Sequence, residues 1–216
     1  LEENVRGSSG VYIDSSGFGH DGTSGSVAIG DPPLQAAGKI GRAQSFDGTN
    51  DTVTVGGIDA AHPLNITQRL TLSCWVNMTA VPVNNEWYNT LSMADATDIP
   101  YNMYLGDDVT KISGDLVIGG TRRDYWVVGA TTIPAAQWVH LAITFDAATG
   151  TRWYVNSVLD ATRADTGSLM DSTGMEFHIG GIPTDAVGPM YGRIDEARVS
   201  DTARSADWIK AEYVNQ

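Results

Sequence analysis

The chain has 216 residues, a length that suits one all-β domain, and we expect a single domain over residues 1–216. Its 26 acidic and 13 basic residues give a formal net charge of −13, which excludes the basic footprint of a nucleic-acid binder and disfavours an anionic membrane surface. Solubility accounts for most of the surplus charge, and one or two calcium-binding clusters are the alternative for the rest.

Short runs rich in Thr, Val, Ile and aromatic residues, separated by Gly, Asn, Asp and Pro, predict strands along the chain. In chain order these runs are 43–46, 51–55, 70–76, 102–105, 115–118, 125–128, 139–145, 151–156, 175–179 and 192–200. One helix is predicted at the end, where Ser205 can cap it, Asp207 favours its N-terminus, and Ile209 and Tyr213 share a face. Many strands with one short helix predict an all-β, antiparallel two-sheet sandwich.

Three of these runs alternate with period two. Leu70, Leu72, Cys74 and Val76 point one way, and the runs 139–145 and 175–179 follow the same pattern. Gly150 lies between the runs 139–145 and 151–156, where its tolerance of positive φ predicts a hairpin turn. Cys74 is the single cysteine, so it forms no internal disulfide, and we expect a small buried side chain there.

The sequence offers no recognisable catalytic apparatus. A retaining glycosidase needs two carboxylates about 5 Å apart, yet Asp195 and Glu196 are adjacent and would point to opposite faces of a strand. No Gly-x-Ser-x-Gly elbow, metalloprotease histidine pair or phosphate loop is present. His140 and His178 lie in apolar strands, where hydrogen-bonded structural roles are favoured. We therefore expect no enzyme and no catalytic residues.

Several blocks resemble bacterial laminin-G-like domains of the concanavalin A-like lectin/glucanase superfamily, in the same order along the chain. They are DSSGFGHDGT from Asp14, GKIGRAQSFDG from Gly38, NDTVTV from Asn50, LTLSCWV from Leu70, WVHLAITFD from Trp138, WYVN from Trp153, YGRIDEARV from Tyr191 and SADWIKAEY from Ser205. The resemblance implies a jelly-roll of one concave and one convex sheet, frequent calcium, and frequent roles in carbohydrate or protein adhesion. The chain departs from catalytic relatives because it lacks their acidic strand motif.

Calcium prefers hard oxygen ligands, and the turn 47–51 supplies Asp47 and Asp51 at its two ends. In similar domains this loop faces the closing strand, which here carries Asp195. Ile194 and Ala197 both look directed to the core at a spacing that breaks period two, so a bulge could re-aim Asp195. We predict one structural calcium held by Asp47, Asp51 and Asp195; the alternative is a simple Asx turn at Asp47.

Aromatic residues with polar neighbours suit a surface that binds sugars, because flat rings pack on the apolar faces of sugars while polar groups bond the hydroxyls. Such mixtures occur in apparent loops at 84–88, 98–104 and 122–126. The predicted ligand-binding residues are Trp87, Tyr88, Tyr101, Tyr104, Arg122, Arg123 and Trp126. For Trp75, Trp138 and Trp153 an ordinary place in a strand is favoured.

The leading functional hypothesis is a non-catalytic, lectin-like module that binds a polysaccharide or glycan. A protein-interaction or adhesion module and a structural spacer are the alternatives, and a glycoside hydrolase is the least favoured. No apolar stretch approaches the roughly 20 residues that insert in and span a membrane, and no signal peptide is present. The chain begins abruptly at Leu1, which suits a mature fragment or an excised domain. From the resemblance we expect part of a larger multidomain protein that is secreted or displayed at the cell surface.

Overall fold

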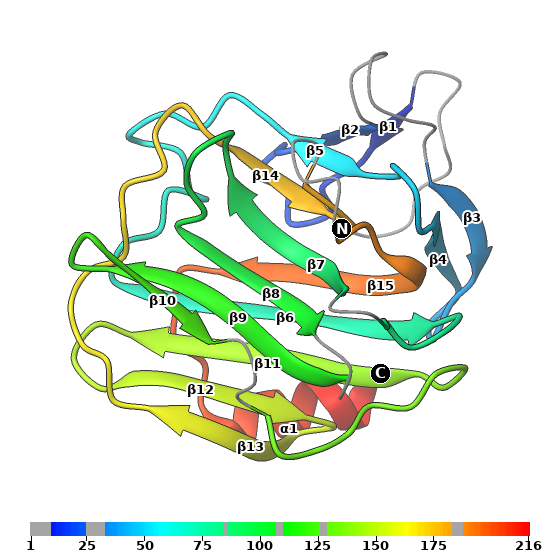
Figure 1. Ribbon diagram of the computed structural model, residues 1–216. Coiled ribbons are helices and arrows are strands. Elements are labelled where there is room, and N and C mark those ends of the chain that lie inside the picture. The colour runs from blue at the N-terminus through cyan, green and yellow to red at the C-terminus, as the bar shows by residue number, and fades with distance from the viewer. Residues whose placement is uncertain (1–9, 25–32, 84–85, 107–109, 126–128, 183–187) are drawn as a thin grey trace.

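The computed structural model describes residues 10–24, 33–83, 86–106, 110–125, 129–182 and 188–216, which form two packed antiparallel sheets and one helix (Figure 1). The eight-stranded sheet has the order β1 (Val11–Tyr12), β2 (Gly22–Ser24), β5 (Val53–Val55), β14 (Glu176–Ile179), β7 (Trp87–Ala94), β8 (Tyr101–Gly106), β9 (Lys111–Ile118) and β10 (Thr121–Tyr125). The seven-stranded sheet has the order β13 (Val158–Arg163), β12 (Gly150–Val155), β11 (Val139–Asp146), β6 (Arg69–Met78), β15 (Tyr191–Ser200), β4 (Arg42–Asp47) and β3 (Leu34–Ala37). The predicted jelly-roll sandwich is confirmed.

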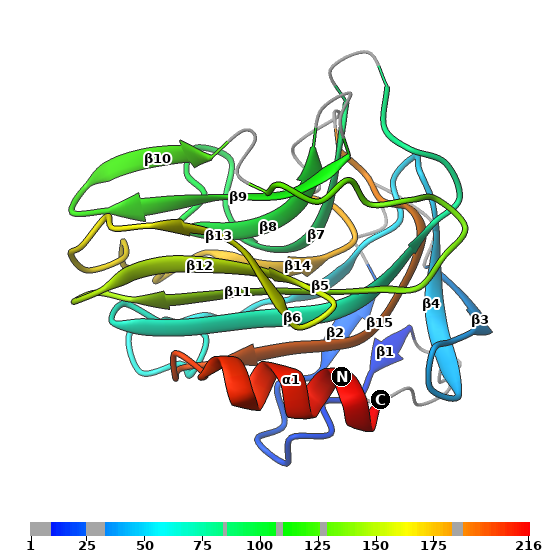
Figure 2. The ribbon, with the colours of Figure 1, turned by 90° about the horizontal axis from the view of Figure 1, so that it is seen from below.

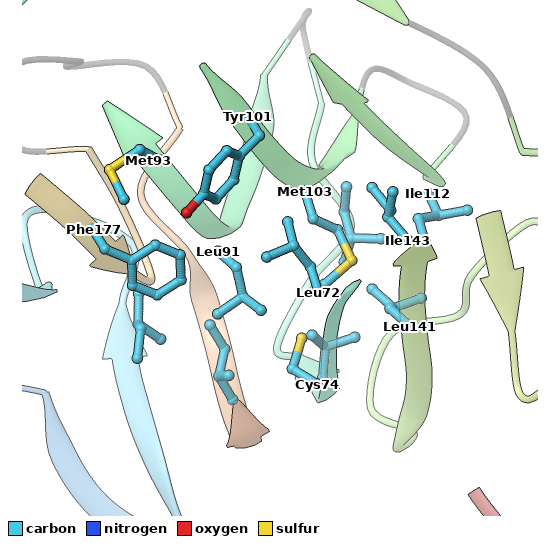
Figure 3. Packing of buried hydrophobic residues seen from close by; sticks show 14 of the residues in the cluster. Leu72, Cys74, Leu91, Met93, Tyr101, Met103, Ile112, Leu141, Ile143 and Phe177 are labelled. Carbon is cyan, nitrogen blue, oxygen red and sulfur yellow. The ribbon is translucent and has the colours of Figure 1, made fainter. Parts of the chain in front are cut away.

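The core lies between the two sheets and is built from one side of each strand. Leu72 and Cys74 of β6 meet Leu91 and Met103 of the facing sheet, and all four side chains are fully buried (Figure 3). The alternation predicted for 70–76 is therefore confirmed, because the apolar members face inward. Burial raises the pKa of the Cys74 thiol far above its usual range, which suits a small core residue.

The turn at Gly150 and the helix cap at Ser205 that the sequence predicts are both present in the structure. Gly150 has a φ of +92° at the turn between β11 and β12. Helix α1 (Ala206–Asn215) begins after Ser205, whose hydroxyl accepts a hydrogen bond from the Trp208 backbone N–H at 3.2 Å. The bulge predicted near Asp195 is also present, because the pairing of β15 with β6 shifts between Asp195 and Arg198, and Glu196 has a φ of +51°.

The remaining predicted strands coincide with parts of β4, β5, β8, β9, β12, β14 and β15. The run 125–128 agrees only at Tyr125, where β10 ends, and residues 126–128 lie outside the described part of the chain. The segments 84–88, 98–104 and 122–126 were expected to be loops, yet β7 begins at Trp87, β8 begins at Tyr101 and β10 runs over 121–125. β10 forms a tight hairpin with β9 around Gly119 and Gly120, and β7 pairs with the next strand, β8. β7 also pairs with the distant β14, a contact that a single sequence does not show.

The outer faces of the two sheets differ. Helix α1 lies against the seven-stranded sheet, where Ile209 packs on Ala142 and Tyr154 (Figure 2). Over the outer face of the eight-stranded sheet, Figure 2 shows no helix or strand among the described elements. Among the described elements, the helix thus covers the outer side of the seven-stranded sheet alone.

Candidate functional site

The outer side of β7, β8, β9 and β10 is lined by polar and aromatic side chains. We call it the polar face, and its residues are Trp87, Asn89, Ser92, Asn102, Tyr104, Ser113, Asp115 and Arg122. Their positions follow from alternation, since the residues between them, such as Met103 and Leu116, enter the core. The pairing of β7 with β8 shifts between Asn89 and Leu91, and this bulge keeps both Asn89 and Ser92 on the outer side.

Two side chains of the polar face are buried and have no hydrogen-bond partner. Asn89 is 1% exposed and Ser92 is fully buried. Within the described part of the chain, neither amide atom of Asn89 nor the hydroxyl of Ser92 finds a partner. Thr90, between them, differs because its hydroxyl donates to the Met103 carbonyl at 2.7 Å. An unsatisfied buried polar group costs about 1–3 kcal/mol, so these two residues weaken the fold unless water or a ligand bonds them.

An ion pair lies at the β9–β10 side of the polar face. The Arg122 guanidinium donates to the Asp115 carboxylate at 2.7 Å, and the Asp115 side chain is 8% exposed while that of Arg122 is 50% exposed. The backbone N–H of Asp115 donates to the Asn102 side-chain oxygen at 2.5 Å. A buried carboxylate thus holds a half-exposed arginine that can still reach solvent.

Trp87 occupies the end of the polar face where β7 begins, and it is partly buried. Gly188 packs against it: a Cβ on Gly188 would lie 2.5 Å from Trp87 Nε1 and 2.7 Å from Asn89 Nδ2. The Gly188 carbonyl also accepts the Asn89 backbone N–H at 2.8 Å. Tyr104 pairs with Asn89 across the strands and is 8% exposed. The tight approach of Gly188 therefore positions an indole ring beside an unpartnered amide.

The structure separates the predicted ligand-binding residues into three groups. Trp87, Tyr104 and Arg122 share the polar face. Tyr88 and Tyr101 belong to the core instead, because neighbouring residues of a strand point to opposite sides. The Tyr101 hydroxyl donates to the Leu64 carbonyl at 2.7 Å, and burial raises the pKa of this phenol. Neither core tyrosine is retained as a ligand-binding residue.

The other two predicted residues are Arg123 and Trp126. Arg123 points to the opposite side of β10 from Arg122, and its guanidinium lies 3.9 Å from the Asp165 carboxylate. It is therefore removed from the polar face. Trp126 lies outside the described residues.

The three acids predicted to hold calcium do not come together. Asp195 is 3% exposed and accepts backbone N–H groups from Lys39 at 2.7 Å, Ile40 at 2.9 Å and Glu196 at 2.8 Å. The bulge aims it at the turn before β4, whereas Asp47 lies at the far end of β4, opposite Tyr191. The three predicted ligands are therefore not grouped in this structure, because Asp195 is directed toward the turn before β4.

At the turn 47–51, Asp47 accepts the Thr49 N–H at 2.7 Å, and Asp51 accepts the Asp47 N–H at 2.8 Å. This is the Asx-type turn that was the alternative to calcium. Across the described residues, no group of three or more His, Cys, Asp or Glu side chains is arranged to hold a metal ion. Calcium binding by the chain stays a prediction, to be tested by thermal melting with EDTA and with added calcium.

Sequence reasoning missed Asn89, Ser92, Asn102, Ser113 and Asp115. A signal for part of this set exists in 101–105, where Asn102 and Tyr104 alternate with three residues that enter the core. No such signal exists in β7, because its bulge interrupts the alternation.

His178 of β14 is a structural neighbour of this face, as expected from the sequence. Its Nδ1 lies 3.0 Å from the Thr54 hydroxyl, and the exposed Glu176 carboxylate is 4.0 Å from its Nε2. Burial lowers the pKa of His178 from 6.5 to about 4, since the charged imidazolium is poorly solvated there. The side chain is therefore neutral at pH 7.

This pKa predicts a pH dependence of stability. Above pH 6.5, His178 is neutral in both the folded and the unfolded chain. Between pH 6.5 and 4 only the unfolded chain binds the proton, so the free energy of unfolding decreases as the pH is lowered. Between pH 7 and pH 4, the His178→Gln variant should lose about 2–3 kcal/mol less free energy of unfolding than the parent chain. Urea unfolding at both pH values measures the difference. Equal losses in the two proteins would show that His178 does not titrate in this way.

Comparison with known proteins agrees with this architecture. Domain 4 of AbnA, a GH43 extracellular arabinanase from Geobacillus stearothermophilus solved with arabinotriose, is 22% identical, with a TM-score of 0.68 over 94% of this chain and 96% of that one. The binding domain of botulinum neurotoxin serotype G is 15% identical, with a TM-score of 0.67 over 94% of this chain. This chain covers only 48% of that toxin domain, about half its length. At these identities the likeness shows the fold.

A heptameric SAP-like pentraxin from Limulus polyphemus also matches, at 15% identity and a TM-score of 0.56 over 77% of this chain and 78% of that one. No curated protein matches the chain by sequence. The family model described as the concanavalin A-like lectin/glucanases superfamily matches residues 47–210. The match spans most of the sequence, and the chain belongs to the concanavalin A-like lectin/glucanase superfamily.

Proposed function

We propose that the chain is a non-catalytic, lectin-like domain that binds a glycan on the polar face. The observation that carries the proposal is the pair of buried, unpartnered polar side chains, Asn89 and Ser92, on the outer side of the sheet. A sugar offers many hydroxyl groups, each of which both donates and accepts hydrogen bonds. The Asn89 amide can likewise donate and accept, and the Ser92 hydroxyl can do both.

Trp87 supplies the apolar part of such a site. Sugar rings present C–H faces that pack on flat aromatic side chains, and Trp87 is half-buried at the end of the polar face, beside Asn89. The half-exposed Arg122 adds donors at the β9–β10 side. One aromatic platform and several hydroxyl-binding groups thus lie along neighbouring strands.

The acids of the polar face support a binding role rather than hydrolysis. The described carboxylate of the polar face, that of Asp115, is committed to Arg122 at 2.7 Å. Asp124 of β10 pairs with Asp115 across the strands, and its side chain lies outside the described part of the structure. A glycosidase of the usual kind needs a second carboxylate, about 5 Å away in retaining enzymes and about 6.5–9.5 Å away in inverting ones. Described residues of the polar face supply no such partner.

The known structures with this fold support the same reading. The arabinanase domain was solved with arabinotriose, and a botulinum neurotoxin serotype D domain was solved with N-acetylneuraminic acid. The first is one domain of an extracellular enzyme. We extend the proposal accordingly to a secreted or cell-surface protein in which this domain is one of several. No described helix is long and apolar enough to cross a membrane.

Binding and stability should respond in opposite directions to removal of the Ser92 hydroxyl. Ser92→Ala breaks no hydrogen bond to a described residue, so the free energy of unfolding should rise or stay within about 1 kcal/mol. Affinity for a retained glycan should fall about threefold to tenfold, because one hydroxyl contact is lost. Isothermal titration calorimetry with glycans selected on an array, together with urea unfolding, measures both.

Thr90→Val is the matched control, since it removes a neighbouring hydroxyl that is bonded to the Met103 carbonyl. It should cost about 1 kcal/mol of stability and leave glycan affinity unchanged. Trp87→Ala should weaken binding about tenfold through the lost ring contact. Retention of no glycan at millimolar concentration, or unchanged affinity in both Ser92→Ala and Trp87→Ala, would refute the proposed site.

A further inference from the structure

We infer that the glycan bound by the polar face is uncharged, a chain of neutral sugars without carboxylate, sulfate or phosphate groups. The inference rests on the proposed function and adds the chemical class of the ligand. It comes from the way the described charges of the face are arranged.

The arginine that could recognise an anionic sugar is already neutralised. Arg122 donates to Asp115 at 2.7 Å, and the Asp115 side chain is 8% exposed. Both residues are held by the strand pairing of β9 with β10, in which Arg122 lies opposite Val117. A sugar carboxylate that approached Arg122 would therefore meet a fixed carboxylate a few ångströms away, and the two like charges would repel.

Next to the ion pair, the polar face consists of uncharged groups. Asn89, Ser92, Asn102 and Ser113 are buried side chains with hydroxyl or amide oxygens. A sugar hydroxyl can donate to these oxygens and accept from their N–H or O–H groups, whereas a carboxylate or sulfate only accepts. An anion would leave the unpartnered oxygens of Asn89 and Ser92 unsatisfied and facing a negative charge. His178, buried beside the face, is neutral at pH 7 and adds no positive charge.

The charges at the Trp87 end are balanced as well. Lys111, the first residue of β9, is partly exposed two strands from Trp87, and the exposed Glu86 directly precedes Trp87. Farther away, the formal net charge of −13 on the whole chain opposes the approach of a polyanion. Neither the near nor the distant field favours an acidic polysaccharide.

The test compares ligands that differ only in charge. One pair is polygalacturonic acid and its carboxyl-reduced polymer, and another is sialyllactose and its carboxyl-reduced form, within an array of neutral and acidic glycans. The parent chain should retain neutral members and bind each acidic counterpart about tenfold more weakly at low salt. Tighter binding of acidic members, weakened by added salt, would overturn this inference and leave the proposed function standing. Retention of no glycan of either class would refute the proposed function itself.

Two variants test the ion pair directly. Asp115→Asn removes the carboxylate that neutralises Arg122, so the ratio of acidic to neutral binding should rise about fivefold to tenfold. Asp165→Asn makes the same change in charge beside Arg123, on the other side of β10, and should leave the ratio unchanged. Equal ratios in the two variants would contradict the assignment of selectivity to Asp115. Thermal melting checks that both variants fold, and the comparison of matched ligands on the parent chain needs no variant.

Discussion

Replacing Asp195 by alanine is expected to lower the free energy of unfolding by about 3–5 kcal/mol. The carboxylate accepts three backbone N–H groups, those of Lys39, Ile40 and Glu196, and it is 3% exposed. Its removal leaves these donors without a charged acceptor, at about 1–3 kcal/mol each where water does not reach them. Urea unfolding at pH 7 measures the loss.

Asp195→Asn is the matched variant, because it keeps one carbonyl oxygen and nearly the same volume. It should lose less stability than Asp195→Ala. Since the acceptor role needs no metal, EDTA should affect the parent chain and Asp195→Ala equally. If EDTA destabilised the parent chain by several kcal/mol and left Asp195→Ala unchanged, Asp195 would be a calcium ligand after all.

Replacing Glu212 by alanine is the second change with a large expected effect, again about 3–5 kcal/mol. Glu212 lies on the buried face of α1, with its side chain 2% exposed. Its carboxylate accepts from the Ser73 hydroxyl at 3.0 Å and from Arg198 at 3.3 Å. His140 Nε2 lies 3.4 Å from the other carboxylate oxygen. Loss of this group leaves buried polar partners uncompensated and loosens α1 from the seven-stranded sheet.

Hydrogen exchange of the α1 amides, combined with urea unfolding, measures this effect. Arg69→Ala is the control: it removes an ion pair with Asp146 in which the Arg69 side chain is 63% exposed, so it should cost less than about 1 kcal/mol. If Glu212→Ala cost no more than Arg69→Ala, the buried network would not be what holds α1 in place.

The parts of the fold that were predicted correctly are those with strong local signals. Strands β6 and β11 alternate strictly, Gly150 supplies its turn, and Ser205 caps α1. Strand β7 lacks such a signal, because a bulge between Asn89 and Leu91 breaks the alternation. Its structure depends on pairing with distant segments, which a single sequence does not show.

The candidate site was predicted in part, for a related reason. Trp87, Tyr104 and Arg122 were identified from composition, and all three share the polar face. Tyr88 and Tyr101 were chosen by the same criterion and lie in the core, because composition does not tell which side of a strand a residue occupies. The burial of Asn89 and Ser92 without partners becomes visible only in three dimensions.

The position of α1 has a practical consequence for handling the domain. Because the helix covers the outer side of the seven-stranded sheet and ends at the C-terminus, Gln216 lies on the opposite side of the sandwich from the polar face (Figure 2). A biotin or fluorophore attached after Gln216 would therefore project away from the ligand. A domain anchored to a sensor chip through that end would present its polar face to the sample. This is the orientation needed when the immobilised domain is used to detect glycans in solution.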